Sequence, residues 1–104
     1  MSQFEDRERA YEARFAHDEE LRFKAMARRN RLLGRWAAEK LGRTGDAVTA
    51  YENEVIRADF SEPGDEDVFR KVRADFDAAG VAVSDSEIRM KMRELLVTAA
   101  EQVS

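Results

Sequence analysis

The sequence predicts an all-α protein, a four-helix bundle preceded by a mobile N-terminal helical arm. Apolar residues recur three and four positions apart in four successive segments, which is the period of an amphipathic helix. Glycines, a single proline and capping residues separate those segments. At 104 residues the chain forms one small folded unit, and we expect it to be a monomer. We expect residues 1–17 to form the arm and residues 18–104 to form the bundle.

The composition excludes several classes of protein. Without cysteine and with His17 as its only histidine, the chain has no disulfide, thiol nucleophile or histidine metal cluster. No apolar run approaches the length of a membrane span, and no signal peptide is visible, so we expect a cytoplasmic protein without membrane insertion. The glycine loops that bind nucleotides in enzymes are missing too. We therefore predict no catalytic residues, no metal site and no enzymatic activity.

The N-terminal segment, residues 2–16, reads as a helix with little to bury. Ser2 and Glu5 have the spacing of a capping box. Its large apolar residues, Phe4, Tyr11 and Phe15, lie seven and four positions apart on one narrow stripe. Short helices are marginally stable in water unless they pack on something. The segment is therefore either partly formed and mobile in the free protein, or packed under the bundle through its last two aromatic residues.

The central helix is expected over residues 18–41. Asp18 is a plausible N-cap and begins an acidic first turn, whereas the later turns are basic, which suits the helix dipole. Gly42 offers the left-handed residue that often ends a helix. Two adjacent apolar stripes predict a broad buried face. They consist of Leu21, Ala25, Leu32 and Trp36, and of Met26, Leu33, Ala37 and Leu41.

Three further helices are expected over residues 46–61, 65–79 and 84–102. Thr44 or Asp46 is a candidate cap for the first of them. Pro63 and Gly64 break the chain before the second, Gly80 ends it, and the apolar run 81–83 has no partner strand. A second capping box, Ser84 to Glu87, opens the last helix. We expect one core shared by Leu33, Trp36, Phe76, Ile88, Met92 and Leu95, with Trp36 partly buried.

The central helix also carries a run of bases without an acid among them, Arg22 to Arg35. Four of these bases repeat at helical spacing and would repel one another unless anions answer them. Carboxylates of the later helices are one source of those anions, and phosphates or an acidic protein surface are another. A small anion- or nucleic-acid-binding module using the Arg22–Arg35 face is therefore an alternative function. The net charge of −4 weakens its nucleic-acid form.

Two runs in the N-terminal half carry a resemblance to a known family. They are FEDRERAYEARF at residues 4–15 and FAHDEELRFKAMARRNRLLGRWAAEKLG at residues 15–42. The chain resembles the zeta-type ATPase-inhibitor proteins of alphaproteobacteria. The resemblance extends over essentially the whole chain, and it is strongest in these runs.

The resemblance implies a function and a set of partners. Similar proteins bind the catalytic head of the F-type ATP synthase and inhibit its ATP hydrolysis. Their N-terminal segment enters an interface between alpha and beta subunits and reaches toward the central stalk, so the implied partners are the alpha, beta and gamma subunits. The protein would lie at the periphery of the inner-membrane synthase. The matching inhibitory residues of this chain are Phe4, Arg7, Glu8, Tyr11, Glu12 and Phe15.

The resemblance also implies ADP or ATP as a weak regulatory ligand, with no cofactor required. No motif places the pocket, so we select it by charge and by the stacking surface of an indole. The expected nucleotide-binding residues are Lys24, Arg28, Arg29, Arg31, Arg35 and Trp36.

Overall fold

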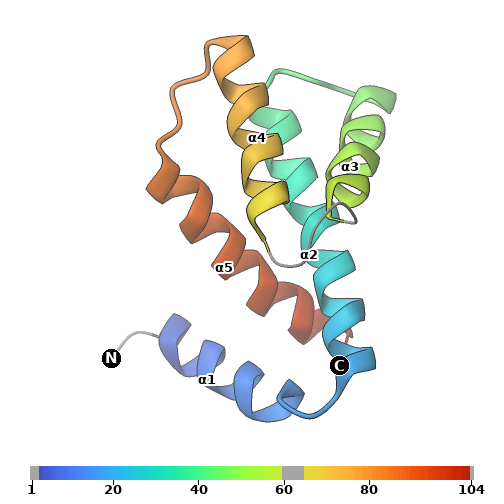
Figure 1. The fold of residues 1–104 in the computed structure, drawn as a ribbon, viewed down its shortest axis with the longest axis vertical. Coiled ribbons are helices and arrows are strands. Elements are labelled where there is room, and N and C mark those ends of the chain that lie inside the picture. Colours follow the sequence, from blue (N-terminus) through green and yellow to red (C-terminus); the bar gives the residue numbers. More distant parts are fainter. Residues whose placement is uncertain (1–2, 60–64, 104) are drawn as a thin grey trace.

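The computed structural model describes residues 3–59 and 65–103, and this part of the chain contains five α-helices and no strand (Figure 1). The all-helical class is therefore confirmed. The run 81–83 is a loop between two helices, as expected. The helices are α1 (Gln3–Phe15), α2 (Glu19–Lys40), α3 (Asp46–Ala58), α4 (Glu66–Ala79) and α5 (Asp85–Val103).

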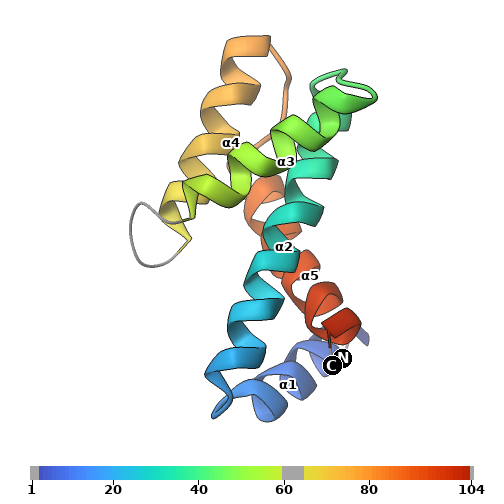
Figure 2. The ribbon, with the colours of Figure 1, turned by 90° about the vertical axis from the view of Figure 1, so that its right-hand side faces the viewer.

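Helix α2 is the longest, and it packs against α3 and α5. Helix α4 packs against α3 and α5. Helix α1 crosses the end of the molecule at which α2 begins and α5 ends (Figures 1 and 2). The N-terminal segment is therefore present as a helix that contacts the rest of the protein. None of the described helices combines the length and the apolar composition that crossing a membrane requires.

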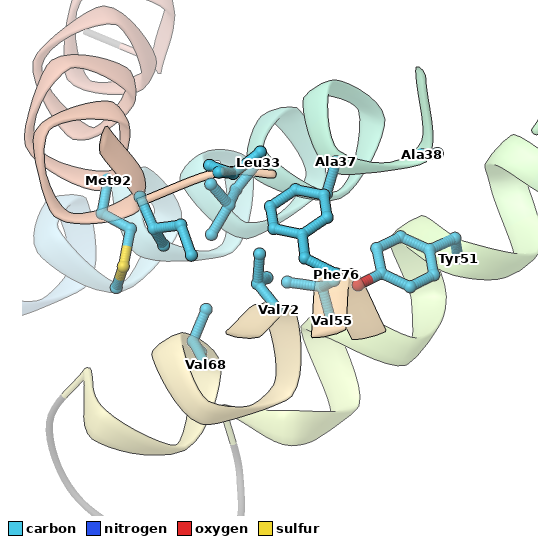
Figure 3. Packing of buried hydrophobic residues seen from close by; sticks show 11 residues of the cluster. Leu33, Ala37, Ala38, Tyr51, Val55, Val68, Val72, Phe76 and Met92 are labelled. Carbon is cyan, nitrogen blue, oxygen red and sulfur yellow. The ribbon is translucent and has the colours of Figure 1, made fainter. Parts of the chain in front are cut away.

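Most of the buried apolar side chains form one cluster between α2, α3, α4 and α5, called here the main core (Figure 3). Trp36 is partly buried at its margin, and its ring meets that of Phe76 edge to face at 5.7 Å. Leu95 packs beside the cluster as well, so the six predicted residues do share one core. The buried members are Leu33, Ala37, Ala38, Tyr51, Val55, Val68, Val72, Phe76, Val83, Ile88 and Met92.

A second, smaller cluster, the α1 cluster, fastens α1 to the rest of the protein. Phe15 of α1 is 2% exposed and packs with Ala25 of α2 and Ala100 of α5. Tyr11 lies beside them and is partly buried. The structure thus shows the packed arrangement of Tyr11 and Phe15. Mobility of the arm in solution stays a prediction.

Four predicted helix ends are confirmed. The Asp18 carboxylate accepts a hydrogen bond from the Leu21 amide at 3.0 Å, and the Ser84 hydroxyl accepts one from the Glu87 amide at 3.1 Å. Gly42 and Gly80 follow α2 and α4 with positive φ angles of 78° and 69°.

The predicted cap of the third helix is wrong. Gly45, with a φ of +58°, takes the N-cap position, and no side chain caps the helix there. Glycine adopts this backbone shape more readily than any other residue, so it suits the N-cap position of this turn. Asp46 is therefore the first residue of the helix, and Thr44 precedes the cap. From that position the negative charge of the Asp46 carboxylate still interacts favourably with the positive end of the helix dipole. The expectations for Ser2, Pro63 and Gly64 lie outside the described residues.

Candidate functional site

One stripe of side chains on helix α1 packs against the rest of the chain. Phe15 is buried, and the four side chains at positions 4, 7, 8 and 11 are partly buried. Five of the six predicted inhibitory residues therefore face the rest of the chain, since positions spaced three and four apart share one side of a helix. Glu12 is the exception, because it points to solvent.

Two ion pairs join α1 to α5, and both are bidentate. Arg7 donates to the two carboxylate oxygens of Glu101 at 2.9 and 2.6 Å. Arg93 donates to the two carboxylate oxygens of Glu8 at 3.2 and 2.9 Å. A guanidinium that meets a carboxylate through two parallel bonds fixes direction as well as distance. Hydrogen bonding to Arg7 lowers the pKa of Glu101, and the same contact raises the pKa of Arg7.

The aromatic residues of α1 lie along the same stripe. The rings of Tyr11 and Phe15 are 5.0 Å apart, and the Arg93 guanidinium lies 5.5 Å from the centre of the Phe4 ring. Burial raises the pKa of the Tyr11 hydroxyl. Two surface hollows border these rings. A hollow of about 120 Å³ lies where α1 meets Ala100 and Glu101 of α5, and one of about 360 Å³ lies where α1 meets α2.

The outward side of α1 offers no large apolar residue among those described. It presents charged side chains and the small side chains of Ala10 and Ala13. The three aromatic residues of the helix are thus all on the side that meets α2 and α5. The connection to α2 is short, because α1 ends at Phe15 and Asp18 already caps the next helix.

The predicted nucleotide-binding residues are spread over several surroundings. Arg31 and Arg35 both donate to Glu52 of α3, at 3.1 and 3.0 Å, and Glu52 is 4% exposed. Arg28 donates to Gln102 of α5 at 2.7 Å, and Lys24 pairs with Glu20 at 3.3 Å. A carboxylate of a later helix therefore answers Arg31 and Arg35, as the first of the two sequence interpretations expects, whereas Lys24 pairs within α2 and Arg28 meets a neutral amide.

Arg29 is the residue whose place differs most from the sequence expectation, because it is fully buried. Its guanidinium donates to Asp65 and to Asn30, both at 2.8 Å. A buried arginine that is paired and hydrogen-bonded acts as part of the packing. A signal for this was present, since Arg29 stands four residues from both Ala25 and Leu33 on the buried face of α2.

Trp36 lies apart from Arg31 and Arg35, which face α3. It lines a groove of about 460 Å³ between the end of α2 and the start of α5. The ammonium groups of Lys40 and Lys91 lie 5.7 and 6.0 Å from its ring centre. Spacing along the sequence could not reveal Lys91, because it comes from another helix. In the described residues no cluster of three or more metal-ligating side chains occurs.

Comparison with known proteins places the chain in a family. The family model for the ATPase inhibitor subunit zeta matches residues 1–102, which include all of α1. A protein solved by solution NMR is 48% identical, over 79% of this chain and 93% of that chain, with a TM-score of 0.71. No curated protein matches. Because the family model matches essentially the whole chain, from before α1 to near the end of α5, the chain belongs to the ATPase inhibitor subunit zeta family.

Proposed function

We propose that this protein inhibits ATP hydrolysis by the F-type ATP synthase by inserting α1 into an interface between an alpha and a beta subunit of the catalytic head. The observation that carries the proposal is the composition of α1. Its three aromatic residues form a single stripe, and its remaining residues are charged, polar or small. An amphipathic helix that enters a groove is recognised through such a stripe of anchors.

The anchors and the charges of α1 have separate roles in this proposal. Aromatic residues in a helix-in-groove interface dominate the binding free energy, and truncating one costs about 2–4 kcal/mol. Charged residues such as Arg7, Glu8 and Glu12 set encounter rate and register more than affinity. The gamma subunit comes into reach if the helix passes through the interface toward the central stalk.

The helices α2–α5 serve as the anchor that holds the inhibitor on the head, at the periphery of the membrane-bound synthase. Support for this division comes from the packing. Each member of the main core belongs to α2, α3, α4, α5 or the loop before α5, and none belongs to α1. The anchor therefore keeps its principal apolar contacts when α1 leaves.

The test compares the full chain with a chain that begins at Ala16 and with Phe4→Ala and Tyr11→Ala. The measurement is the rate of ATP hydrolysis by the isolated synthase head as inhibitor is added. We expect the shortened chain not to inhibit, and each point variant to lose affinity by roughly thirty- to a thousandfold. Phe23→Ala is the matched control, because Phe23 is an exposed aromatic on α2. Full inhibition by the shortened chain would refute the proposal.

We also propose a weak regulatory site for ADP or ATP at the groove that Trp36 lines. Support comes from the Trp36 indole ring, which has the ammonium groups of Lys40 and Lys91 beside it in an open groove, where Glu87 and Glu94 pair with these two lysines and would have to give way to phosphates. Without a glycine loop the affinity should be micromolar to millimolar, or about 4–8 kcal/mol. In an ATP titration followed by NMR, the Trp36 indole and the Lys91 amide should shift. Shifts confined to the amides of residues 22–31 would instead favour the basic face.

A further inference from the structure

The side chains that would anchor α1 in the synthase are already in use within this protein. Phe15 is buried against α2 and α5, Tyr11 is partly buried beside it, and Phe4 lies under the Arg93 guanidinium. Arg7 and Glu8 are each held by a bidentate partner on α5. A helix with one apolar stripe cannot bury that stripe in two places at once.

We propose that docking of α1 on α2 and α5 is an autoinhibitory contact that competes with the synthase for the same side chains. The inference rests on the proposed function, because it takes α1 as the inhibitory element. In the docked state the inhibitor is inactive. Binding to the head requires α1 to leave α5, so the apparent affinity is the intrinsic affinity reduced by the fraction of molecules in which α1 is free.

The charges on α5 are arranged to hold α1 in one register. Glu101 of α5 pairs with Arg7 of α1, and Arg93 of α5 pairs with Glu8 of α1. The two pairs therefore run in opposite directions between the helices. Thr98 lies 3.4 Å from the Arg7 guanidinium, between those two positions on α5. The pairing therefore selects a single position for α1 along α5, since shifting the helix by one turn would break both pairs.

The contact is also built to be reversible. Both ion pairs are partly exposed to solvent, with side-chain exposures of 41% and 51% for Arg7 and Glu101 and of 52% and 25% for Arg93 and Glu8, and pairs open to water contribute little individually. Surface hollows of about 120 and 360 Å³ border Tyr11 and Phe15 where α1 meets α5 and α2, so solvent reaches the edges of this contact. Phe15 is the only fully enclosed aromatic residue among those described in α1, and Tyr11 is partly buried beside it, so a well-fitted groove on a partner can compete with this contact.

The start of α2 does not depend on α1. The Asp18 side chain accepts from the Leu21 amide and its carbonyl accepts from the Arg22 amide, so the first turn of α2 is closed by its own cap. One backbone bond, from the Asp18 amide to the Phe15 carbonyl at 3.2 Å, links the two helices at their junction. Helix α1 can therefore swing away about residues 16–17 while α2 stays intact.

The test weakens the dock from the α5 side and leaves α1 unchanged. Glu101→Gln and Arg93→Gln each remove one ion pair, and the double variant removes both. Asp85→Asn and Arg89→Gln make the same changes of charge elsewhere on α5, where the partners are Arg73 and Glu66. Two quantities are measured for each full-length protein. One is amide hydrogen exchange over residues 3–15 in the free inhibitor, and the other is the concentration that half-inhibits ATP hydrolysis by the synthase head.

We expect exchange in α1 to accelerate and the half-inhibitory concentration to fall by about two- to fivefold for each single variant, because more molecules have α1 free. The two controls should change neither quantity. Faster exchange with unchanged or weaker inhibition would overturn the competition, and unchanged exchange would overturn the role of the ion pairs. Failure of the proposed function would look different, because the chain that begins at Ala16 would then still inhibit.

Discussion

Gly34 of α2 lies so close to Glu52 of α3 that a Cβ atom on Gly34 would come within 2.8 Å of the Glu52 Cα atom. The absence of a side chain at Gly34 is therefore what allows the two helices to meet at this point. Glu52 then reaches Arg31 and Arg35, which stand on either side of Gly34 along α2. Close backbone approach and a buried carboxylate thus occur at the same crossing.

Gly34→Ala should destabilise the protein by about 1–3 kcal/mol, because the clash involves backbone atoms that cannot rotate away. The direction of the change in stability is informative, because a glycine-to-alanine change in a solvent-exposed helix stabilises by roughly 0.5–1 kcal/mol. Urea unfolding followed by circular dichroism measures it. A raised unfolding midpoint would show that α2 and α3 do not approach as described.

Glu52→Ala should cost about 1–3 kcal/mol, because it leaves two cations without the carboxylate between them. The cost stays moderate, since the side chains of Arg31 and Arg35 are 39% and 50% exposed and can regain water. Arg31→Ala and Arg35→Ala should each cost under about 1 kcal/mol, because Glu52 keeps its other partner. Equal losses from all three variants in urea unfolding would contradict this asymmetry.

Phe15→Ala and Phe76→Ala make the same change in the two apolar clusters and should differ in effect. Phe76 is fully buried in the main core, so its truncation should lower the free energy of unfolding by about 3–5 kcal/mol. Phe15 lies in the α1 cluster, so its truncation should release α1 and leave the main transition nearly unchanged. Hydrogen exchange resolved by helix, together with thermal melting, distinguishes the two. The chain that begins at Ala16 should melt at almost the same temperature as the full chain.

Docking of α1 should weaken in acid. The pKa of Glu101 is lowered below its ordinary value of 4.5 by Arg7, which also lies near Glu94. A carboxyl group with a lowered pKa in the folded state stabilises above its ordinary pKa and loses that contribution as pH falls through the lowered value. We therefore expect α1 to detach progressively below about pH 4.5.

Amide chemical shifts of Ala10 and Ala13 in a titration from neutral pH downward would follow this detachment. Glu101→Gln is the control, because it removes the titrating group. If the shifts of the two proteins follow the same curve, the Glu101 carboxyl is not what holds α1 at neutral pH.

The helices and most of their ends could be predicted from sequence because they depend on neighbouring residues. Asp18, Gly42, Gly80 and Ser84 act within a few positions of themselves, so their roles are visible locally. The cap of α3 could not be predicted in this way. It depends on the φ angle of Gly45, which the surrounding turn imposes.

The candidate sites depend on contacts between distant segments, and here the sequence was less informative. The spacing of the bases along α2 predicts a shared face, yet Asp65 and Glu52, which answer Arg29, Arg31 and Arg35, come from later elements. The stripe of α1 is visible in the sequence as well. Its counterpart on α5 is not, because periodicity gives the side of a helix and leaves its neighbour undetermined.

The short connection at residues 16–17 limits how far α1 can move from α5 once it is released. A tether of two residues keeps a released α1 within a small volume around α5, which corresponds to an effective concentration of roughly millimolar or more. A dissolved partner at lower concentration cannot match this by diffusion alone. If helices α2–α5 are bound to the synthase, however, the groove is held near α1, and its local concentration rises to a comparable level. Under the proposed mechanism, inhibition would then require α1 and the helices α2–α5 to bind the synthase at the same time, because neither would suffice alone.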